Sequence, residues 1–253
     1  STQGVSSAAS DVYKRQVSVV LVRCSAEEKG PAEADFGTPA AAWQKNDLGY
    51  YFNTSGRAMP AAVLKGMDVS KFQGEIDWEK AKAAGIDFAI IRCGYRGYGS
   101  GALVEDSTYR RNIQGAINAG LRVGVYFYSQ AINEAEAVEE ASMVLSLVSG
   151  YSLPLGVYYD TESVGGGRAN ALSAAERTAC AVAFCETIRS AGYSAGVYSY
   201  ASWFYNALNF ANISKYNIWI AQYRDTLSFS YKHNIWPVSY THLRAHETKA
   251  NLV

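Results

Sequence analysis

The feature that most constrains the fold is a regular alternation of short apolar and amphipathic segments between residues 66 and 236. Apolar stretches of five to eight residues, which are typical of strands, lie at 66–70, 88–95, 123–128, 155–160, 196–200 and 218–223. Segments with helical spacing separate the first five of them, at 78–84, 106–119, 134–149 and 173–191. Apolar strands that alternate with helices predict a parallel sheet covered on its outer face.

The longest helical segment carries signals for both of its ends. Ser173 and Glu176 have the spacing of a capping box, in which each side chain satisfies a backbone group of the other. Gly192 follows at the point where the apolar period stops. We therefore predict that this helix begins directly after Ser173 and ends before Gly192.

Polar residues distinguish a barrel from a doubly wound sheet. They stand at or just beyond the carboxyl ends of different strands, where barrel enzymes carry their chemistry: Asp68, Arg92, Ser129, Asp160, Glu162, Ser199 and Gln222. No glycine-rich phosphate loop follows the first strand, so the nucleotide-binding form of the doubly wound sheet loses support. The sequence therefore favours an α/β barrel.

Charge and histidine usage exclude several classes of partner. Lys plus Arg and Asp plus Glu both number 23, so the whole chain has no field that would gather nucleic acid. The three histidines, His233, His242 and His246, all lie near the C-terminus, which leaves the barrel segment without a histidine base or zinc cluster. No run of 18 apolar residues exists. We expect a monomer with no metal, no cofactor, no nucleic-acid partner and no transmembrane segment.

Both ends of the chain differ in pattern from the middle. Residues 5–16 and 237–253 resemble translated sequencing-adapter read-through, and no apolar period continues after Trp236. We therefore expect residues 1–16 and 237–253 to be non-native flanks outside the fold. Residues 17–42 read as either a signal-peptide remnant or a meaningless flank, followed by a linker rich in Ala, Glu, Gly and Pro.

A small aromatic unit at 43–65 precedes the barrel segment, which we place at 66–236. It has two short strand-like pieces around Gly and Asn turn signals, with Trp43 and Tyr51 among its aromatic residues. The unit resembles one repeat of the Trp- and Tyr-rich cell-wall-binding modules. A plain linker hairpin explains it equally well, because such repeats need neighbours to bury their faces.

The strongest candidate for chemistry is the acidic pair Asp160 and Glu162, directly after the apolar strand at 155–160. Residues two apart on an extended strand project to the same face, so both carboxylates point into the rim and Thr161 points away. Close carboxylates raise each other's proton affinity, so that one stays protonated near neutral pH. Glycoside hydrolysis needs such a pair, one group to protonate the leaving oxygen and one to carry negative charge. Asp68, on another strand end, is expected to share this rim.

Further side chains along the same strands are candidates for substrate binding: Arg92, Tyr126, Tyr128, Tyr198, Tyr200, Trp219, Gln222 and Tyr223. Aromatic rings near the strand ends could stack on sugar rings. Because the aromatic residues alternate along strands, we expect about half of them to face the barrel interior and half to face the helices. Arg92 has an alternative role as the buried partner of an acid.

The run GMDVSKFQG at 66–74, followed by IDW at 76–78, resembles the opening motif of the glycoside hydrolase family 25 lysozymes. Similar segments follow in the family's order at 88–95, 124–128, 160–162, 196–200 and 219–223. The resemblance implies an irregular TIM-like (β/α)5(β)3 barrel and cleavage of the β-1,4 bond between N-acetylmuramic acid and N-acetylglucosamine in peptidoglycan.

The same resemblance implies a role for each acid. Glu162 would be the proton donor, and Asp160 would stabilise charge or orient the N-acetyl group of the substrate. Asp68 would line the cleft. The binding partner would be the peptidoglycan glycan strand, and the protein would be secreted or held at the cell surface.

The chain departs from the family pattern at its last strand. Ile235 and Trp236 look like the start of a Trp-Gln-Tyr-like motif, and residues 237–253 replace the rest, including a fourth cleft acid. The resemblance therefore implies a barrel that lacks its last strand. Two alternatives stay open: a non-catalytic cell-wall-binding protein, and a chitinase-like glycosidase. The chitinase motif would place an Asp where this chain has Tyr158.

Overall fold

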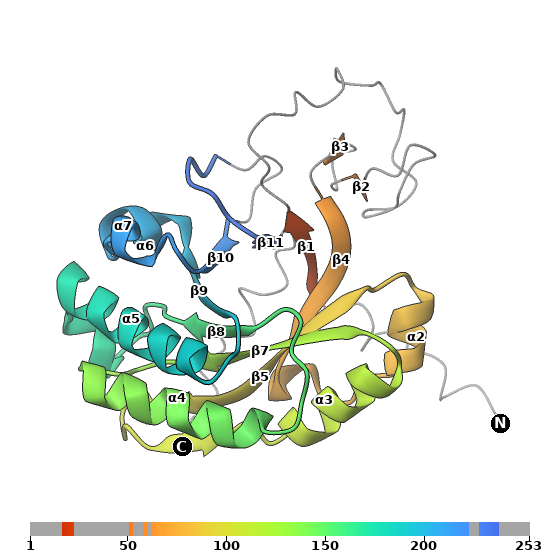
Figure 1. The fold of residues 1–253 in the computed structure, drawn as a ribbon, viewed down its shortest axis with the longest axis horizontal. Helices are drawn as coiled ribbons and strands as arrows, with labels where there is room; N and C mark the ends of the chain where they lie inside the picture. The colour runs from red at the N-terminus through yellow and green to blue at the C-terminus, as the bar shows by residue number, and fades with distance from the viewer. Residues whose placement is uncertain (1–16, 23–50, 53–57, 60–61, 223–227, 238–253) are drawn as a thin grey trace.

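The computed structural model describes residues 17–22, 51–52, 58–59, 62–222 and 228–237. Strands and helices alternate along most of this part of the chain (Figure 1). In chain order the elements are β1 (Val17–Val22), β2 (Tyr51–Phe52), β3 (Ala58–Met59), β4 (Ala62–Val69), η1 (Lys71–Gln73), α2 (Trp78–Ala83), β5 (Phe88–Arg96), β6 (Leu103–Glu105), α3 (Tyr109–Asn118), β7 (Arg122–Tyr128), α4 (Glu134–Val148), β8 (Val157–Asp160), η2 (Arg168–Ala171), α5 (Ala174–Ser190), β9 (Ala195–Tyr200), α6 (Ala201–Asn206), α7 (Phe210–Ile213), β10 (Asn217–Ala221) and β11 (Ile235–Pro237).

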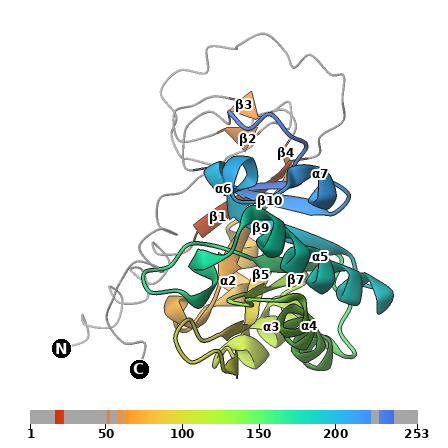
Figure 2. The same cartoon turned by 90° about the vertical axis from the view of Figure 1, so that its left-hand side faces the viewer.

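The parallel strands form a curled sheet of the TIM-like type. β4, β5, β7, β8, β9, β10 and β11 are each parallel to the next in this series, and α3, α4 and α5 lie on the outer face of the sheet (Figures 1 and 2). These parallel strands thus present their carboxyl ends at one rim. The α/β barrel predicted from the sequence is confirmed.

The last parallel strand, β11, has only three residues, at the place where the sequence predicts that the last strand of the barrel is missing. A single register pair, Trp219 with Ile235, joins it to β10. The backbone of β1 runs antiparallel between β11 and β4, with Val20 opposite Trp236 on one side and Lys65 on the other. Sequence analysis leaves residues 17–22 outside the barrel. Their Val- and Leu-rich run nevertheless has high strand propensity, and the edges of β4 and β11 offer it hydrogen-bonding partners.

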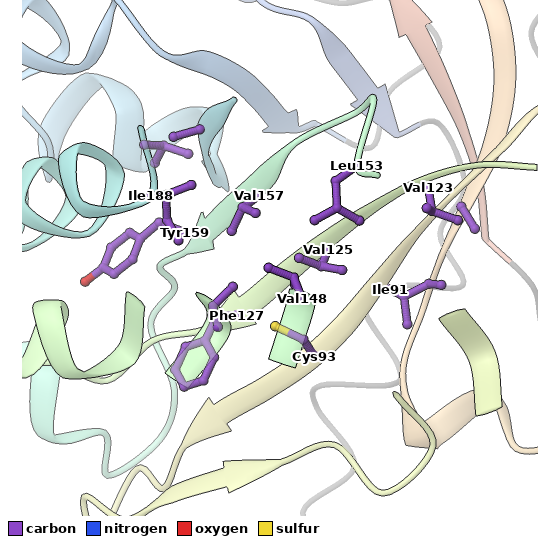
Figure 3. Close-up of a cluster of buried hydrophobic side chains, with 14 of the residues drawn as sticks. Ile91, Cys93, Val123, Val125, Phe127, Val148, Leu153, Val157, Tyr159 and Ile188 are labelled. Atoms are coloured by element: carbon purple, nitrogen blue, oxygen red, sulfur yellow. The ribbon is translucent and has the colours of Figure 1, made fainter. Parts of the chain in front are cut away.

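The main core lies between the sheet and the helices. Val125 and Phe127 of β7 lie beside Val157 and Tyr159 of β8 within one buried cluster, which also includes Val148 of α4 (Figure 3). The helix α5 begins and ends where the sequence predicts. At its start, Ser173 Oγ accepts from the Glu176 N–H and the Glu176 carboxylate accepts from the Ser173 N–H.

A second buried cluster fills the inside of the barrel. Trp219 lies at its centre, with ring centroids 5.8, 5.6 and 4.5 Å from those of Tyr126, Tyr158 and Tyr198. Gly196 makes room for this packing, because a Cβ there would lie 2.4 Å from the Tyr158 ring. The prediction that half of the candidate aromatic residues face the helices is wrong for the described ones. Residues two apart on a strand share a face, so each strand directs all of its candidate aromatic side chains toward the barrel interior.

A hairpin packs against the amino ends of β4 and β5. β2 and β3 pair antiparallel, with Tyr51 opposite Met59, inside the aromatic unit expected at 43–65. The Tyr51 hydroxyl donates to Asp87 Oδ2 at 3.0 Å, and the same oxygen accepts from the Lys65 N–H at 2.8 Å. Among the helices that the structure describes, none has the length and apolar character to cross a bilayer.

Candidate active site

The backbone at the end of β8 is held from both neighbouring strands. The Ser129 N–H donates to the carbonyl of Asp160 at 2.9 Å, and the Thr161 N–H donates to the carbonyl of Tyr198 at 3.1 Å. The Ser199 hydroxyl donates to the carbonyl of Thr161 at 2.7 Å. These bonds fix the direction in which the side chains of residues 160–162 point.

Asp160 and Glu162 lie together in a buried position, as their two-residue spacing predicts. Their exposed fractions are 1% and 3%, and a hydrogen bond joins the two carboxyl groups. The Tyr200 hydroxyl donates to Glu162 Oε2 at 2.5 Å. Asp68, at the end of β4, is also buried, and its charge acts on Asp160. The structure therefore brings together the three acids singled out in the sequence.

The pKa of Asp160 is raised well above its ordinary value. Burial is the largest cause, and the negative charge of Glu162 and the hydrogen bond between the two carboxyls act in the same direction. The charge of Arg92 opposes this rise, and the charge of Asp68 adds to it. The raised pKa of Asp160 therefore favours a proton on this carboxyl, and the hydrogen bond to Glu162 links the two groups.

Arg92 is held by an acid that sequence analysis missed. Its Nε and Nη2 atoms each lie 2.7 Å from Oδ2 of Asp106, and both side chains are buried. Of the two roles considered for Arg92, the structure shows the buried partner of an acid. That acid is Asp106, and not a member of the acidic pair. The signal in the sequence was weak: Asp106 begins a turn with Thr108, and a buried Arg requires an anion.

Asp106 also anchors the loop after β4. Its Oδ2 accepts from the Lys71 N–H at 3.1 Å, and its Oδ1 accepts from the backbone and hydroxyl of Thr108. Burial alone would raise the pKa of Asp106, but the charge of Arg92 and these hydrogen bonds lower it overall. Asp106 is thus an ionised carboxylate that joins the ends of β4 and β5.

The candidate aromatic residues for substrate binding lie at two places. Tyr126, Tyr198 and Trp219 are buried in the barrel interior, while Tyr200 is half-buried beside Glu162. Tyr128 lies close to both acids. Burial raises the pKa of its hydroxyl, and the charges of Glu162 and Asp160 raise this pKa further.

The side chain of Gln222 makes two hydrogen bonds to Ser228. Its Nε2 donates to the Ser228 hydroxyl at 2.7 Å, and its Oε1 accepts from the Ser228 N–H at 2.8 Å. Tyr223 lies outside the described residues. In the described ranges, no three His, Cys, Asp or Glu side chains gather closely enough to hold a metal ion.

A buried ionic network supports the loop that follows Glu162. Arg96 of β5 donates to Glu140 Oε1 at 2.8 Å and also contacts Glu139 at 3.0 Å. Arg168, in η2, makes two hydrogen bonds of 2.8 and 2.9 Å to Glu136. The network ties the loop after β8 and the end of β5 to the first turns of α4. Sequence analysis missed it, because its members lie up to 72 positions apart, from Arg96 to Arg168.

Glu140 makes stability depend on pH. Burial raises its pKa to about 7, although hydrogen bonds from Ser129 and Arg96 oppose the rise. A carboxyl with a raised pKa stabilises the fold when protonated, so this contribution is complete below pH 4.5 and is lost as the pH rises through about 7.

We therefore expect the free energy of unfolding to fall between pH 5 and pH 8, and Glu140→Gln to remove about 2 kcal/mol of that fall. Urea unfolding at both pH values measures it. Glu139→Gln is the matched control, because Glu139 also contacts Arg96 but is largely exposed. An equal pH dependence in wild type and Glu140→Gln would contradict the assignment.

Comparisons with known proteins agree with the fold described above. Residues 67–244 match the family described as "Glycosyl hydrolases family 25". The chain is 29% identical over 160 residues to an autolytic lysozyme of Clostridium acetobutylicum, covering 63% of this chain and 45% of that protein. It is 31% identical over 126 residues to lysozyme M1 of Streptomyces globisporus, covering 50% of this chain and 40% of that protein. The chain thus spans less than half the length of each of these curated relatives.

Solved structures show the same fold. The modular autolysin LytC of Streptococcus pneumoniae, in complex with a synthetic peptidoglycan ligand, superposes with a TM-score of 0.61 at 26% identity, covering 74% of this chain and 51% of that chain. A family 25 glycosyl hydrolase of Bacillus anthracis gives a TM-score of 0.60 at 21% identity, covering 80% of this chain and 85% of that chain. The second likeness concerns the fold alone.

Proposed function

The chain belongs to the glycosyl hydrolases of family 25, and from this premise we propose that it is a lysozyme. It cleaves the β-1,4 bond between N-acetylmuramic acid and N-acetylglucosamine in peptidoglycan, and residues 66–236 are its catalytic unit. One observation carries the proposal: Asp160 and Glu162 form a buried, hydrogen-bonded carboxyl pair at the carboxyl end of β8. Two carboxyls with one shared proton are the groups that glycoside hydrolysis requires.

Glu162 is the proposed proton donor. The Tyr200 hydroxyl occupies its Oε2 atom, so the proton that passes to the leaving glycosidic oxygen is carried by Oε1. Donation at this point lets the sugar oxygen leave as a neutral hydroxyl instead of an alkoxide. Tyr200 then stabilises the carboxylate that remains on Glu162.

Asp160 is the proposed charged assistant. Its raised pKa favours a proton on the pair, and the hydrogen bond to Glu162 provides a direct path for that proton. When the proton resides on Glu162, Asp160 carries the negative charge that stabilises the oxocarbenium-like transition state or orients the N-acetyl group. Asp68 lines the cleft and adds negative potential beside the pair.

The proposed setting follows from the substrate. Peptidoglycan lies outside the cell membrane, so the enzyme acts as a secreted or surface-held protein. A single chain supplies Asp68, Asp160, Glu162 and Tyr200, so a monomer suffices for the chemistry.

The bond that is cut can be identified directly. Purified peptidoglycan is digested, reduced with borohydride and hydrolysed, and the sugar alcohols are separated. The proposal requires new muramitol, because a muramidase leaves the reducing end on muramic acid. New glucosaminitol without muramitol would instead show cleavage of the other glycosidic bond. Wall binding with neither alcohol would favour the non-catalytic alternative.

A further inference from the structure

An exposed phenylalanine stands on a hydrogen-bonded turn directly after the strand that carries Asp68. Phe72 is 44% exposed in η1, which follows the strand that ends near Asp68. The turn is closed by a capping box: the Ser70 N–H donates to Gln73 Oε1 at 2.7 Å, and Ser70 Oγ accepts from the Phe72 N–H. The Phe72 ring is therefore held at the surface, where a ligand can contact it.

Tyr95 lies beside this turn because β5 is irregular. The register between β5 and β7 shifts after Arg92, which pairs with Tyr126, so that Tyr95 pairs with Tyr128. Without the extra residue, positions 92 and 95 would point to opposite faces of the strand. With it, the Arg92 guanidinium carbon lies 5.0 Å from the Phe72 ring centroid and 5.3 Å from that of Tyr95.

Lys71 completes this corner with a positive charge. Its Nζ lies 5.5 Å from the Phe72 ring centroid and 5.4 Å from that of Tyr95. Arg92 is already neutralised by Asp106, whereas the ammonium of Lys71 makes no salt bridge with a carboxylate of the described residues. The corner therefore offers one uncompensated cation between two rings.

We propose that Lys71, Phe72 and Tyr95 form a subsite for the muramoyl residue, in which Lys71 pairs with a carboxylate and the rings pack on apolar parts of the sugar. This inference rests on the proposed function. Asp68, Asp160 and Glu162 give the cleft a negative potential that repels an anionic polymer, so a cation at its edge compensates for that repulsion. The carboxylate belongs either to the lactyl group or to the stem peptide attached to it.

Binding to the Glu162→Gln protein tests the subsite without turnover. Three soluble glycan chains are compared by calorimetry: chains with stem peptides, peptide-free chains with free lactyl carboxylates, and peptide-free chains with the lactyl group converted to a neutral methylamide. Adding Lys71→Met should raise Kd about fivefold for the anionic chain that uses the subsite. It should leave Kd for the neutral chain unchanged.

The pattern of losses identifies the source of the carboxylate. A loss confined to peptide-bearing chains assigns it to the stem peptide, and a loss confined to peptide-free chains assigns it to the lactyl group. A loss on both supports a general carboxylate site. Lys71→Arg should bind like the parent, and Phe72→Ala should weaken all three chains.

Two results would overturn the subsite. One is an equal change in Kd for charged and neutral chains when Lys71 is replaced by Met. The other is a change in Kd as large as that of Lys71→Met when Lys82, an exposed lysine of α2, is replaced by Met. Failure of the lysozyme proposal is a separate outcome, because it appears as an absence of new muramitol with the wild-type protein.

Discussion

Replacing Glu162 by Gln is expected to lower kcat for peptidoglycan cleavage about a thousandfold. Gln has nearly the same shape and its side-chain oxygen can still accept from the Tyr200 hydroxyl, but it has no acidic proton to give to the leaving oxygen. Because the change removes a transition-state interaction and leaves the groups that bind the ground state, Kd for glycan chains should stay within about twofold. Turbidity clearing of purified walls and release of reducing ends measure the rate.

Glu75→Gln serves as the control for this experiment. Glu75 is an exposed carboxylate whose ionic contact is with Arg111 of α3, so its loss should leave the rate unchanged. If wild type and Glu162→Gln clear walls at the same rate, Glu162 is not the proton donor. A loss of rate could also come from general damage to the fold. Urea unfolding checks this, because the unfolding curves of wild type and Glu162→Gln should then differ markedly.

Replacing Asp106 by Leu is expected to lower the free energy of unfolding by about 3 to 5 kcal/mol. The change leaves the Arg92 guanidinium buried without its anion and removes the acceptor for the Lys71 and Thr108 N–H groups. Urea unfolding near neutral pH measures the loss. The double variant Arg92→Leu with Asp106→Leu should recover part of it, since both charges are then gone. A cost below about 1 kcal/mol for Asp106→Leu would contradict this account.

The pH dependence of that loss gives an independent check. The pKa of Asp106 is lowered on folding, so its contribution to stability is present above its ordinary value of 3.8 and is lost as the pH falls below it. The difference in unfolding free energy between wild type and Asp106→Leu should therefore narrow below about pH 4. This trend is opposite in direction to that expected for Glu140, which loses its stabilising contribution as the pH rises.

Local patterns in the sequence were sufficient to predict the parallel strands and the acidic pair. The helix that begins after Ser173 has both of its cap signals within 20 residues, and the structure reproduces its ends. Asp160 and Glu162 directly follow an apolar strand, so their position at the rim depends on strand periodicity alone. Such features need no knowledge of which distant segments meet.

Features that depend on tertiary contacts could not be predicted in this way. The pairing of Arg92 with Asp106 depends on the path of the loop between them, and the contact of Tyr200 with Glu162 depends on β8 and β9 being neighbours. The register shift that turns Tyr95 toward Arg92 leaves no signal in an apolar run. The position of β1 depends on the unpaired backbone of two strands far along the chain.

The cluster of rings around Trp219 closes the barrel below the acidic pair. A filled barrel has no through-channel, so anything that reaches Asp160 and Glu162 comes and goes by the same rim. A long polymer lying across that rim keeps both of its termini in solvent. Under the proposed function, cleavage then needs no free chain end, and scission can fall at internal linkages, so that average strand length drops early in digestion.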